Sequence, residues 1–364
     1  MQLVSAHIGR VTGHGLARNL RSALPHPIVS LIVTILLVAN IFNIGADLSA
    51  MGAAAQLVGA GSSHVYVIVF AIVCAGLQLF VPYRRYATIL KWLTLSLLAY
   101  VGVALLVDVD WARALPALIW PTTWTGDALL MIVAIFGTTI SPYLFFWQSS
   151  QEAEEIASSH QHPLKTAPRA VSRQYRRIRI DTLLGMAVSH IIALAIMLAT
   201  AATLHRSGVT NIESAADAAE ALRPLAGSSA SLLFAMGIIG TGLLAVPVLA
   251  GSAAFAVGET HGWKTGLEFK PYQARRFYGI IVAATFMGVV LDWWNVNPIK
   301  ALFWSAVLNG VSAVPIMAAM MVIASKRSIM GPLTERPLLL AFGWAATAVM
   351  ALASAAMLVT SFGG

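Results

Sequence analysis

A proline interrupts the middle of an apolar segment, Gly126–Glu155, that is long enough to cross a membrane. Pro142 has no N–H and its ring clashes with the carbonyl four residues earlier, while Ser141 before it is pushed out of helical geometry. In hydrocarbon every unpaired backbone group is costly, so such a break must be buried in protein or line a wet cavity. Broken helices form substrate and ion sites in secondary transporters, but membrane helices also carry simple proline kinks, and the break alone leaves both interpretations open.

The composition sets the class of protein. Hydrophobic residues make up 58% of the 364 residues and charged residues 10%, whereas about 25% of the residues in a soluble domain are charged. The sequence therefore predicts an all-α integral membrane protein with one transmembrane domain over residues 1–364. The predicted spans cover residues 28–57, 64–82, 86–107, 126–155, 180–204, 229–257, 276–292, 298–324 and 337–361.

Basic residues gather in alternate loops. All but four of the 23 lysines and arginines lie in or beside loops at residues 10–21, 84–91, 165–179, 264–276 and 326–336. By the positive-inside rule these loops are cytoplasmic. We expect a multi-pass protein of the cell inner membrane. The same assignment makes Met1–Leu20 the cytoplasmic end of an inward-running helix, so we expect the chain to begin within a membrane helix.

No feature of the sequence indicates an enzyme. There is no His/Glu zinc motif, nucleophile elbow or phosphate-binding loop. Cys74 is the single cysteine, which rules out an intramolecular disulfide and a cysteine-cluster metal site. The net charge of +8 lies in short loops and does not point to nucleic acid. We expect no cofactor and no obligate protein partner, only the lipid bilayer and a transported substrate.

Four segments, in chain order, carry a resemblance to one known family. Met1–Leu20 (MQLVSAHIGRVTGHGLARNL) and Asn43–Ala54 (NIGADLSAMGAA) resemble the end of the second helix and the third helix of the Nramp family of divalent-metal transporters. Gly137–Ser150 (GTTISPYLFFWQSS) is similar to the broken sixth helix, and Asn297–Leu302 (NPIKAL) to the start of the tenth. The resemblance implies an inverted-repeat fold of the 5+5 type, with ion and metal sites at broken first and sixth helices.

The resemblance also implies an N-terminally truncated chain, without the first helix and most of the second. In the family the first helix carries a D-P-G-N motif whose Asp and Asn bind the metal. We expect either a start codon placed too far downstream or a degenerate gene. The second case leaves a non-transporting remnant or membrane interaction protein as an alternative function. An amino-acid transporter of the same architecture is a further alternative.

The sixth-helix break departs from the family pattern A-x-x-M-P-H, in which the methionine sulfur is a metal ligand. The matching residues here are Thr138, Ser141, Pro142 and Tyr143. A thioether is soft and favours Mn²⁺, Fe²⁺ and heavier metals, whereas a hydroxyl is hard and suits Mg²⁺. This loss of the soft ligand resembles the prokaryotic Nramp-related magnesium transporters and implies transport of Mg²⁺, Mn²⁺ or both.

The groups that carry protons in the family are also largely replaced. Asp47 is retained in the third helix, but the positions that flank it read Asn40 and Ala50. The histidine positions of the sixth helix read Tyr143 and Gln148. A proton wire needs titratable groups within the membrane. The resemblance therefore implies divalent-cation transport by alternating access without proton coupling.

Five residues are candidates for contact with the cation: Thr138, Ser141, Gln148, Asp47 and Asn309. Thr138 and Ser141 lie one helical turn apart and share a face, but both hydroxyls can instead bond back to the kinked backbone. Asp47 is either a charge near the cation path or a partner for a buried polar group. Gln148 can supply an oxygen, and Asn309 either reaches the cavity or joins two helices.

Three glutamates, Glu152, Glu154 and Glu155, follow the broken helix at its cytoplasmic end. They can line a vestibule that concentrates cations. The alternative, which we prefer slightly, is that they are solvated or pair with the basic run at residues 173–179.

Overall fold

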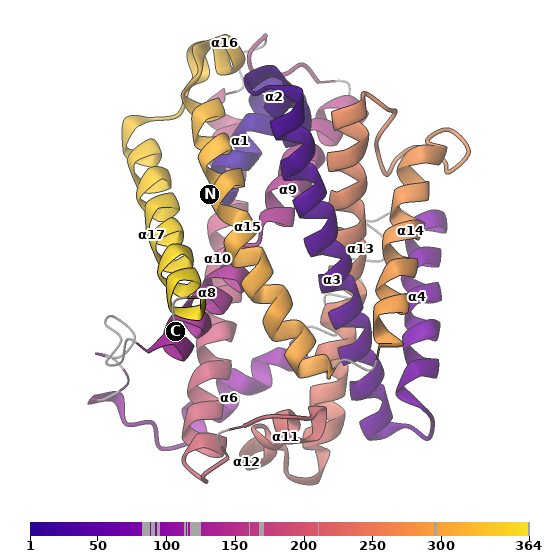
Figure 1. Cartoon of the computed structure of the whole chain (residues 1–364), viewed down its shortest axis with the longest axis vertical. Coiled ribbons are helices and arrows are strands. Elements are labelled where there is room, and N and C mark those ends of the chain that lie inside the picture. The colour runs from indigo at the N-terminus through magenta and orange to yellow at the C-terminus, as the bar shows by residue number, and fades with distance from the viewer. Residues whose placement is uncertain are drawn as a thin grey trace.

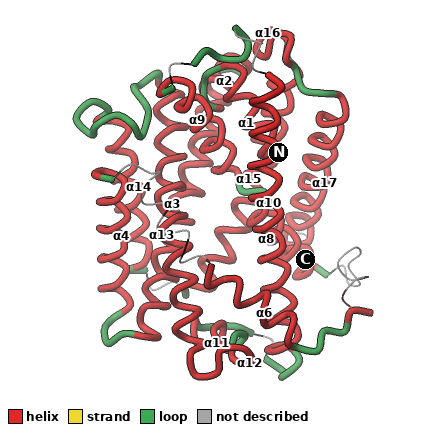
Figure 2. The backbone as a smooth tube through the Cα atoms, turned by 180° about the vertical axis from the view of Figure 1, so that it is seen from behind, coloured by secondary structure: helices red, strands yellow, loops and turns green. Residues whose placement is uncertain are grey.

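The computed structural model describes residues 1–81, 88, 92, 95–112, 114, 116, 125–159, 161–166, 171–209, 211–294 and 297–362. Within these ranges the regular structure is helical, without a strand, as Figures 1 and 2 show. The helices are α1 (Gln2–Thr12), α2 (Leu16–Ala23), α3 (His26–Val58), α4 (Ser63–Phe80), η1 (Leu95–Leu97), α6 (Leu98–Leu106), α8 (Gly126–Thr139), α9 (Pro142–Ser158), α10 (Val171–Thr200), η3 (Ala201–His205), α11 (Ala215–Glu220), α12 (Arg223–Ala226), η4 (Gly227–Ser229), α13 (Ala230–His261), α14 (Arg275–Asp292), α15 (Pro298–Ser325), α16 (Arg327–Met330), η5 (Gly331–Leu333) and α17 (Pro337–Phe362).

Seven helical segments of the described chain are long and apolar enough to cross a membrane, counting α8 with α9 as one. The predicted spans at 86–107 and 276–292 are not among the seven. The first contains the shorter apolar helix Leu95–Leu106, and most of residues 86–94 lie outside the described residues. The second coincides with α14. The nine predicted spans therefore remain a prediction.

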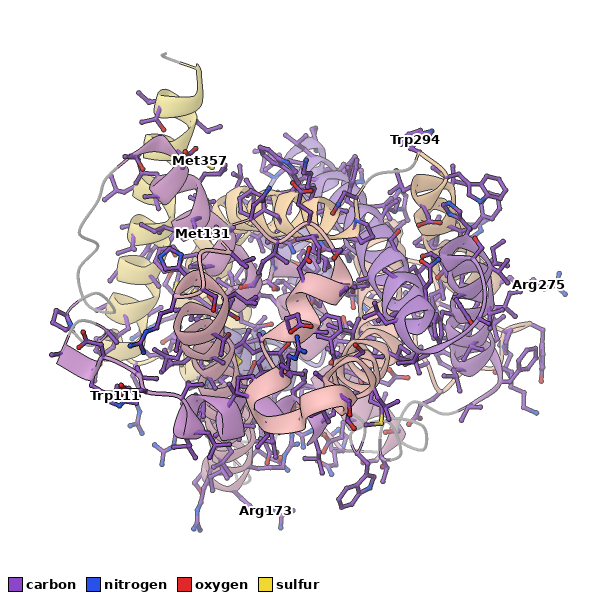
Figure 3. The ribbon with its side chains drawn as sticks, turned by 90° about the horizontal axis from the view of Figure 1, so that it is seen from below. Trp111, Met131, Arg173, Arg275, Trp294 and Met357 are labelled. Atoms are coloured by element: carbon purple, nitrogen blue, oxygen red, sulfur yellow. The ribbon has the colours of Figure 1, made fainter. Side chains whose placement is uncertain are left out.

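α3 runs through the middle of the bundle and packs against α13, α15, α14 and α4. The two halves of the interrupted helix have different neighbours, because α8 packs on α15 and α17 whereas α9 packs on α1 and α13. In Figure 1, α4 and α14 stand side by side at one edge and α17 at the opposite edge. Seen along the bundle in Figure 3, Trp111, Arg173, Arg275 and Trp294 lie at the perimeter.

The two ends of the bundle differ in what they carry. Helices α2 and α16 and the connection from α13 to α14 lie at one end, and α11, α12 and the connection from α3 to α4 lie at the other (Figure 1). Three of the predicted basic loops, near residues 10–21, 264–276 and 326–336, thus share one end. Most of the predicted basic loop at 84–91 lies outside the described residues.

Small residues let α1 lie directly on α9. A Cβ atom added to Gly9 would lie 2.3 Å from the backbone oxygen of Ser149, so the two backbones are in contact there. Apolar side chains complete this packing, with Ile8, Leu16, Phe145 and Phe146 all fully or almost fully buried in one cluster. The apolar packing fixes the position of α9 and, through it, of the break.

Candidate functional site

The interrupted helix is confirmed, and the interruption is short. α8 ends at Thr139 and α9 begins at Pro142, which occupies the first helical position that proline favours. Ile140 has φ −113° and ψ 58°, and Ser141 has φ −75° and ψ 118°, so both residues leave helical geometry. The extended conformation of Ser141 is the one that a following proline imposes.

Two glycines bring α8 and α15 into contact at the level of the break. A Cβ atom on Gly137 would lie 1.8 Å from the backbone oxygen of Ala306, and one on Gly310 would lie 2.7 Å from the oxygen of Val133. No larger residue fits either position without separating the helices. The contact places Asn309, which precedes Gly310, close to the last turn of α8.

The hydroxyls of the two predicted ligands at the break bond to their own helix. Thr138 Oγ1 donates to the carbonyl of Ile135 at 2.8 Å, and Ser141 Oγ lies 3.0 Å from the carbonyls of both Gly137 and Thr138. Ser141 is buried and Thr138 is exposed. Back-bonding uses the hydroxyl hydrogen and leaves oxygen lone pairs free. Both hydroxyls therefore bond back to the kinked backbone, and each keeps an oxygen lone pair with which it can contact a cation.

Asp47 lies on α3 between Ile44 and Leu48, which share an apolar cluster with Trp147 of α9. Its side chain is partly exposed, and no hydrogen bond or ion pair joins it to a residue that the structure describes. Tyr143 of α9 also packs against this cluster, which contains Ile44 and Leu48 on either side of Asp47 in α3. Asp47 has no cationic partner among the described residues, which is suitable for a carboxylate on the path of a cation.

Asn309 is tied to α3 by a reciprocal pair of amide hydrogen bonds. Asn43 Nδ2 donates to Asn309 Oδ1 at 3.0 Å, and Asn309 Nδ2 donates to Asn43 Oδ1 at 3.1 Å. Asn43 Nδ2 also lies 2.8 Å from the carbonyl of Ala39. This is the interhelical alternative for Asn309. A contact with a cation would use the remaining lone pair of its Oδ1.

Asn40, one turn before Asn43 on α3, is buried, and only part of its amide group is hydrogen-bonded. Asn40 Nδ2 donates to Leu249 O at 2.9 Å and to Ser252 Oγ at 2.8 Å, both on α13. Its Oδ1 is buried without a partner among the described residues.

Gln148 lies two turns into α9 and is half-buried. No hydrogen bond joins Gln148 to the other four candidates among the described residues, so its role remains a prediction.

In the ranges that the structure describes, no three His, Cys, Asp or Glu side chains come together in a way that could hold a metal ion. The predicted cation contacts at the break are hydroxyl, carbonyl and amide oxygens together with the Asp47 carboxylate, and they remain a prediction. Such a donor set is hard and neutral in most of its members, and it suits an ion that keeps part of its water.

The far end of α9 carries a buried charged cluster that sequence reasoning found only in part. Glu152 Oε2 lies 2.6 Å from a guanidinium nitrogen of Arg177, and Glu155 lies 3.2 Å from another. Arg10 of α1 is only 1% exposed; it lies 3.8 Å from both carboxylates and donates to Gln161. The structure thus pairs Glu152 and Glu155 with Arg177, as the preferred alternative predicts, and adds Arg10. We call these four residues the α9 charge cluster.

Glu259, at the end of α13, was not a candidate in the sequence. One carboxylate oxygen accepts from Ser150 Oγ at 2.7 Å and the other accepts from the backbone N–H of Arg18 at 3.2 Å. A Cβ atom on Gly15 would lie 1.8 Å from that carboxylate. Glu259 therefore caps the start of α2 and fastens it to α9. Only a long-range contact reveals this role, because residues 15, 150 and 259 are far apart in the chain.

Comparison with known proteins places the chain in a family. Residues 1–360 match the Nramp profile, described as natural resistance-associated macrophage protein-like. The divalent metal cation transporter MntH of Klebsiella pneumoniae subsp. pneumoniae is 25% identical, over 96% of this chain and 80% of that protein. MntH of Acidiphilium cryptum is 27% identical, over 92% of this chain and 74% of its own length.

Solved structures agree in fold. The manganese transporter of Eremococcus coleocola, in complex with an aromatic bis-isothiourea substituted compound, superposes with a TM-score of 0.76 at 14% identity, over 97% of this chain and 76% of that one. A variant of the same transporter gives a TM-score of 0.74 at 15% identity, over 100% of this chain and 78% of the other. The predicted all-helical transporter fold is thereby confirmed. With a family profile that matches almost its whole length, the chain belongs to the Nramp-like family of membrane transport proteins, and it is not an enzyme.

Proposed function

We propose that this protein carries divalent metal cations across a membrane by alternating access, that Mg²⁺ and Mn²⁺ are its substrates, and that no proton is coupled to their movement. Family membership supports transport of a metal, because the relatives described above are divalent metal cation and manganese transporters. The observation that carries the choice of metal is the break at Ser141, where oxygen replaces the sulfur of the family pattern.

The oxygen donors at the break favour hard cations. Ser141 and Thr138 offer hydroxyl oxygens, and the interruption before Pro142 leaves the last carbonyls of α8 without helical partners in α9. Mg²⁺ prefers such oxygens and retains several waters, whereas heavier metals gain most from a thioether. Thr138 is exposed, so the site has room for a partly hydrated ion.

The proposal that no proton is coupled rests on the replaced positions of the third and sixth helices. Asn40 engages α13 as an amide donor, and Tyr143 and Gln148 occupy the histidine positions of the sixth helix. Neither an amide nor a phenol exchanges a proton readily at neutral pH. Asp47 alone among the five candidates carries a titratable group there.

We also propose that the protein lies in the cell inner membrane. The end of the bundle with α2 and α16 then faces the cytoplasm. The shared position of three basic loops at that end supports this assignment (Figure 1). In alternating access the halves α8 and α9 would rock against the helices around α3 and α13.

The test is metal uptake by the purified chain in proteoliposomes, with Mg²⁺ and Mn²⁺ indicators trapped inside. Ser141→Met should shift the ratio of Mn²⁺ to Mg²⁺ uptake by about tenfold toward Mn²⁺, as expected if one soft contact is worth about 1.4 kcal/mol. Ile140→Met is the matched control, because it adds the same sulfur one residue away, on a side chain that packs against the α1–α9 apolar cluster.

Two outcomes would overturn the proposal. An unchanged Mn²⁺/Mg²⁺ ratio in Ser141→Met, or an equal shift in Ile140→Met, would remove the break as the site that selects the metal. A pH dye inside the vesicles should report no metal-dependent acidification, so a proton flux that follows Mn²⁺ would refute uncoupled transport. If the unmodified chain moves neither ion, a non-transporting membrane protein becomes the better account.

A further inference from the structure

A groove of about 500 Å³ lies on the outer face of the bundle, between α4 and α14. Leu79 of α4 and Val282 and Phe286 of α14 line it with apolar side chains, and Phe286 is 63% exposed. Gly279 and Ala283 lie one turn apart on the same face of α14, and a Cβ atom on Gly279 would meet nothing within 4 Å. The groove is therefore an open, apolar depression along α14, which coincides with the predicted span 276–292, with small residues where α14 lines it.

A basic residue stands at one end of this groove. Arg275 is the first residue of α14 and lines the groove, and its side chain points away from the bundle in Figure 3. No ion pair joins it to a carboxylate in the described part of the chain. Arg276 and Lys270 are exposed beside it. The end of the groove thus carries positive charge that the protein itself does not neutralise.

The chain around this end is held in place before any ligand arrives. Tyr278, which also lines the groove, directs its hydroxyl to the carbonyls of Leu267 and Phe269, at 3.3 and 2.8 Å. The backbone N–H of Glu268 donates to Glu154 at 2.7 Å, and the ammonium of Lys264 lies 4.0 Å from the Phe269 ring centroid. These contacts fix the connection from α13 to α14, whose Pro271 lines the groove, so the groove and its basic end form one preformed site.

We propose that this groove binds an anionic phospholipid, with an acyl chain along Gly279 and Ala283 and the headgroup phosphate at Arg275. Charge complementarity identifies the ligand, because an acidic headgroup matches the unpaired arginine while the apolar channel matches a single hydrocarbon chain. The basic end of the groove belongs to the end of the bundle with α2 and α16, where basic residues meet the membrane surface. The site is separate from the break and does not depend on the transported substrate.

Lipid binding to the purified full-length chain can be measured by native mass spectrometry, with phosphatidylglycerol and phosphatidylcholine of identical acyl chains as the probes. The unmodified chain should retain phosphatidylglycerol in preference to phosphatidylcholine. Arg275→Gln should lower that preference by about fivefold, the factor expected for one basic residue at a membrane surface. Gly279→Leu should fill the channel and lower retention of both lipids.

Matched controls separate a site from general attraction. Arg179→Gln removes an exposed basic residue near the start of α10, and Gly185→Leu adds the same side chain at a glycine of α10 whose Cβ position is also open. Both controls should bind lipid as the unmodified chain does. Equal losses in Arg179→Gln and Arg275→Gln would show diffuse attraction and overturn the proposal.

Three further results would also overturn it. These are unchanged phosphatidylglycerol retention in Arg275→Gln, a two-chain species that forms in place of the lipid-bound one, and binding of free phosphate at Arg275 without any acyl-chain dependence. Arg275→Gln changes an exposed side chain and leaves the packing intact, so it keeps the proposal testable even if Gly279→Leu does not fold.

Discussion

The two ends of α9 are stabilised by different kinds of interaction. At Pro142 the helix starts among mostly neutral groups, namely hydroxyls bonded to their own backbone and the amide pair of Asn43 and Asn309, with Asp47 of α3 as the one carboxylate among the predicted cation contacts. Its other end is fastened by the α9 charge cluster and by Glu259, which bonds Ser150. The neutral end can exchange its hydrogen bonds for a cation or water at small cost, whereas the charged end cannot release a partner cheaply. A helix of this kind can reorganise at the break while its far end stays attached to α1 and α10.

The largest effect is expected at the charged end, from Arg10→Ala. This change empties the space of an almost fully buried side chain and removes one of the two cations beside Glu152 and Glu155. Truncation of a large buried side chain to alanine costs about 2–5 kcal/mol. Denaturant unfolding in detergent micelles measures the loss. Arg179→Ala is the control, because Arg179 is exposed. If both variants lose the same small amount of stability, the cluster does not hold α1 and α9 together.

A smaller effect is expected from Gly137→Val, beside the break. Its new side chain would collide with the Ala306 carbonyl, 1.8 Å from the added Cβ atom, and overpacking of this kind costs about 1–3 kcal/mol. The same unfolding measurement applies. Gly185→Val carries the same change in helix propensity at a position with open space. Equal destabilisation of the two variants would show that the contact of α8 with α15 is not tight.

The smallest effect is expected from the amide pair. A double-mutant cycle of Asn43→Ala and Asn309→Ala should give a coupling of about 0.6 kcal/mol, the average for polar pairs between membrane helices. The double variant should then be little less stable than either single one. Binding of Mn²⁺, followed by calorimetry, sharpens the comparison. A loss of Mn²⁺ affinity in Asn309→Ala that Asn43→Ala does not share would favour the predicted cation contact over the interhelical role.

The sequence located the break well and its surroundings poorly. Proline restricts the backbone of adjacent residues, so Pro142 predicted the position of the helix interruption to within two residues. The pairing of Glu152 and Glu155 with the basic run was also an open alternative, because both segments are charged and follow each other. Arg10 and Glu259 were not recognised, since their partners lie on helices distant in the chain. A charge at a helix end resembles any solvated residue until its burial is known.

What the amino-acid sequence determined by itself was the class of the protein, the presence of an interrupted helix and the chemical hardness of the groups at that interruption. These depend on composition, on local backbone sterics and on residue type, which need no neighbour. Only the tertiary structure decided which helix lies against the break, that Asn309 pairs with Asn43, and that Glu259 caps α2. These depend on two backbones coming close enough for Gly137, Gly310 and Gly15 to matter, and on partners more than 100 residues apart in the chain. Such contacts are set by packing over the whole bundle, which no local pattern encodes.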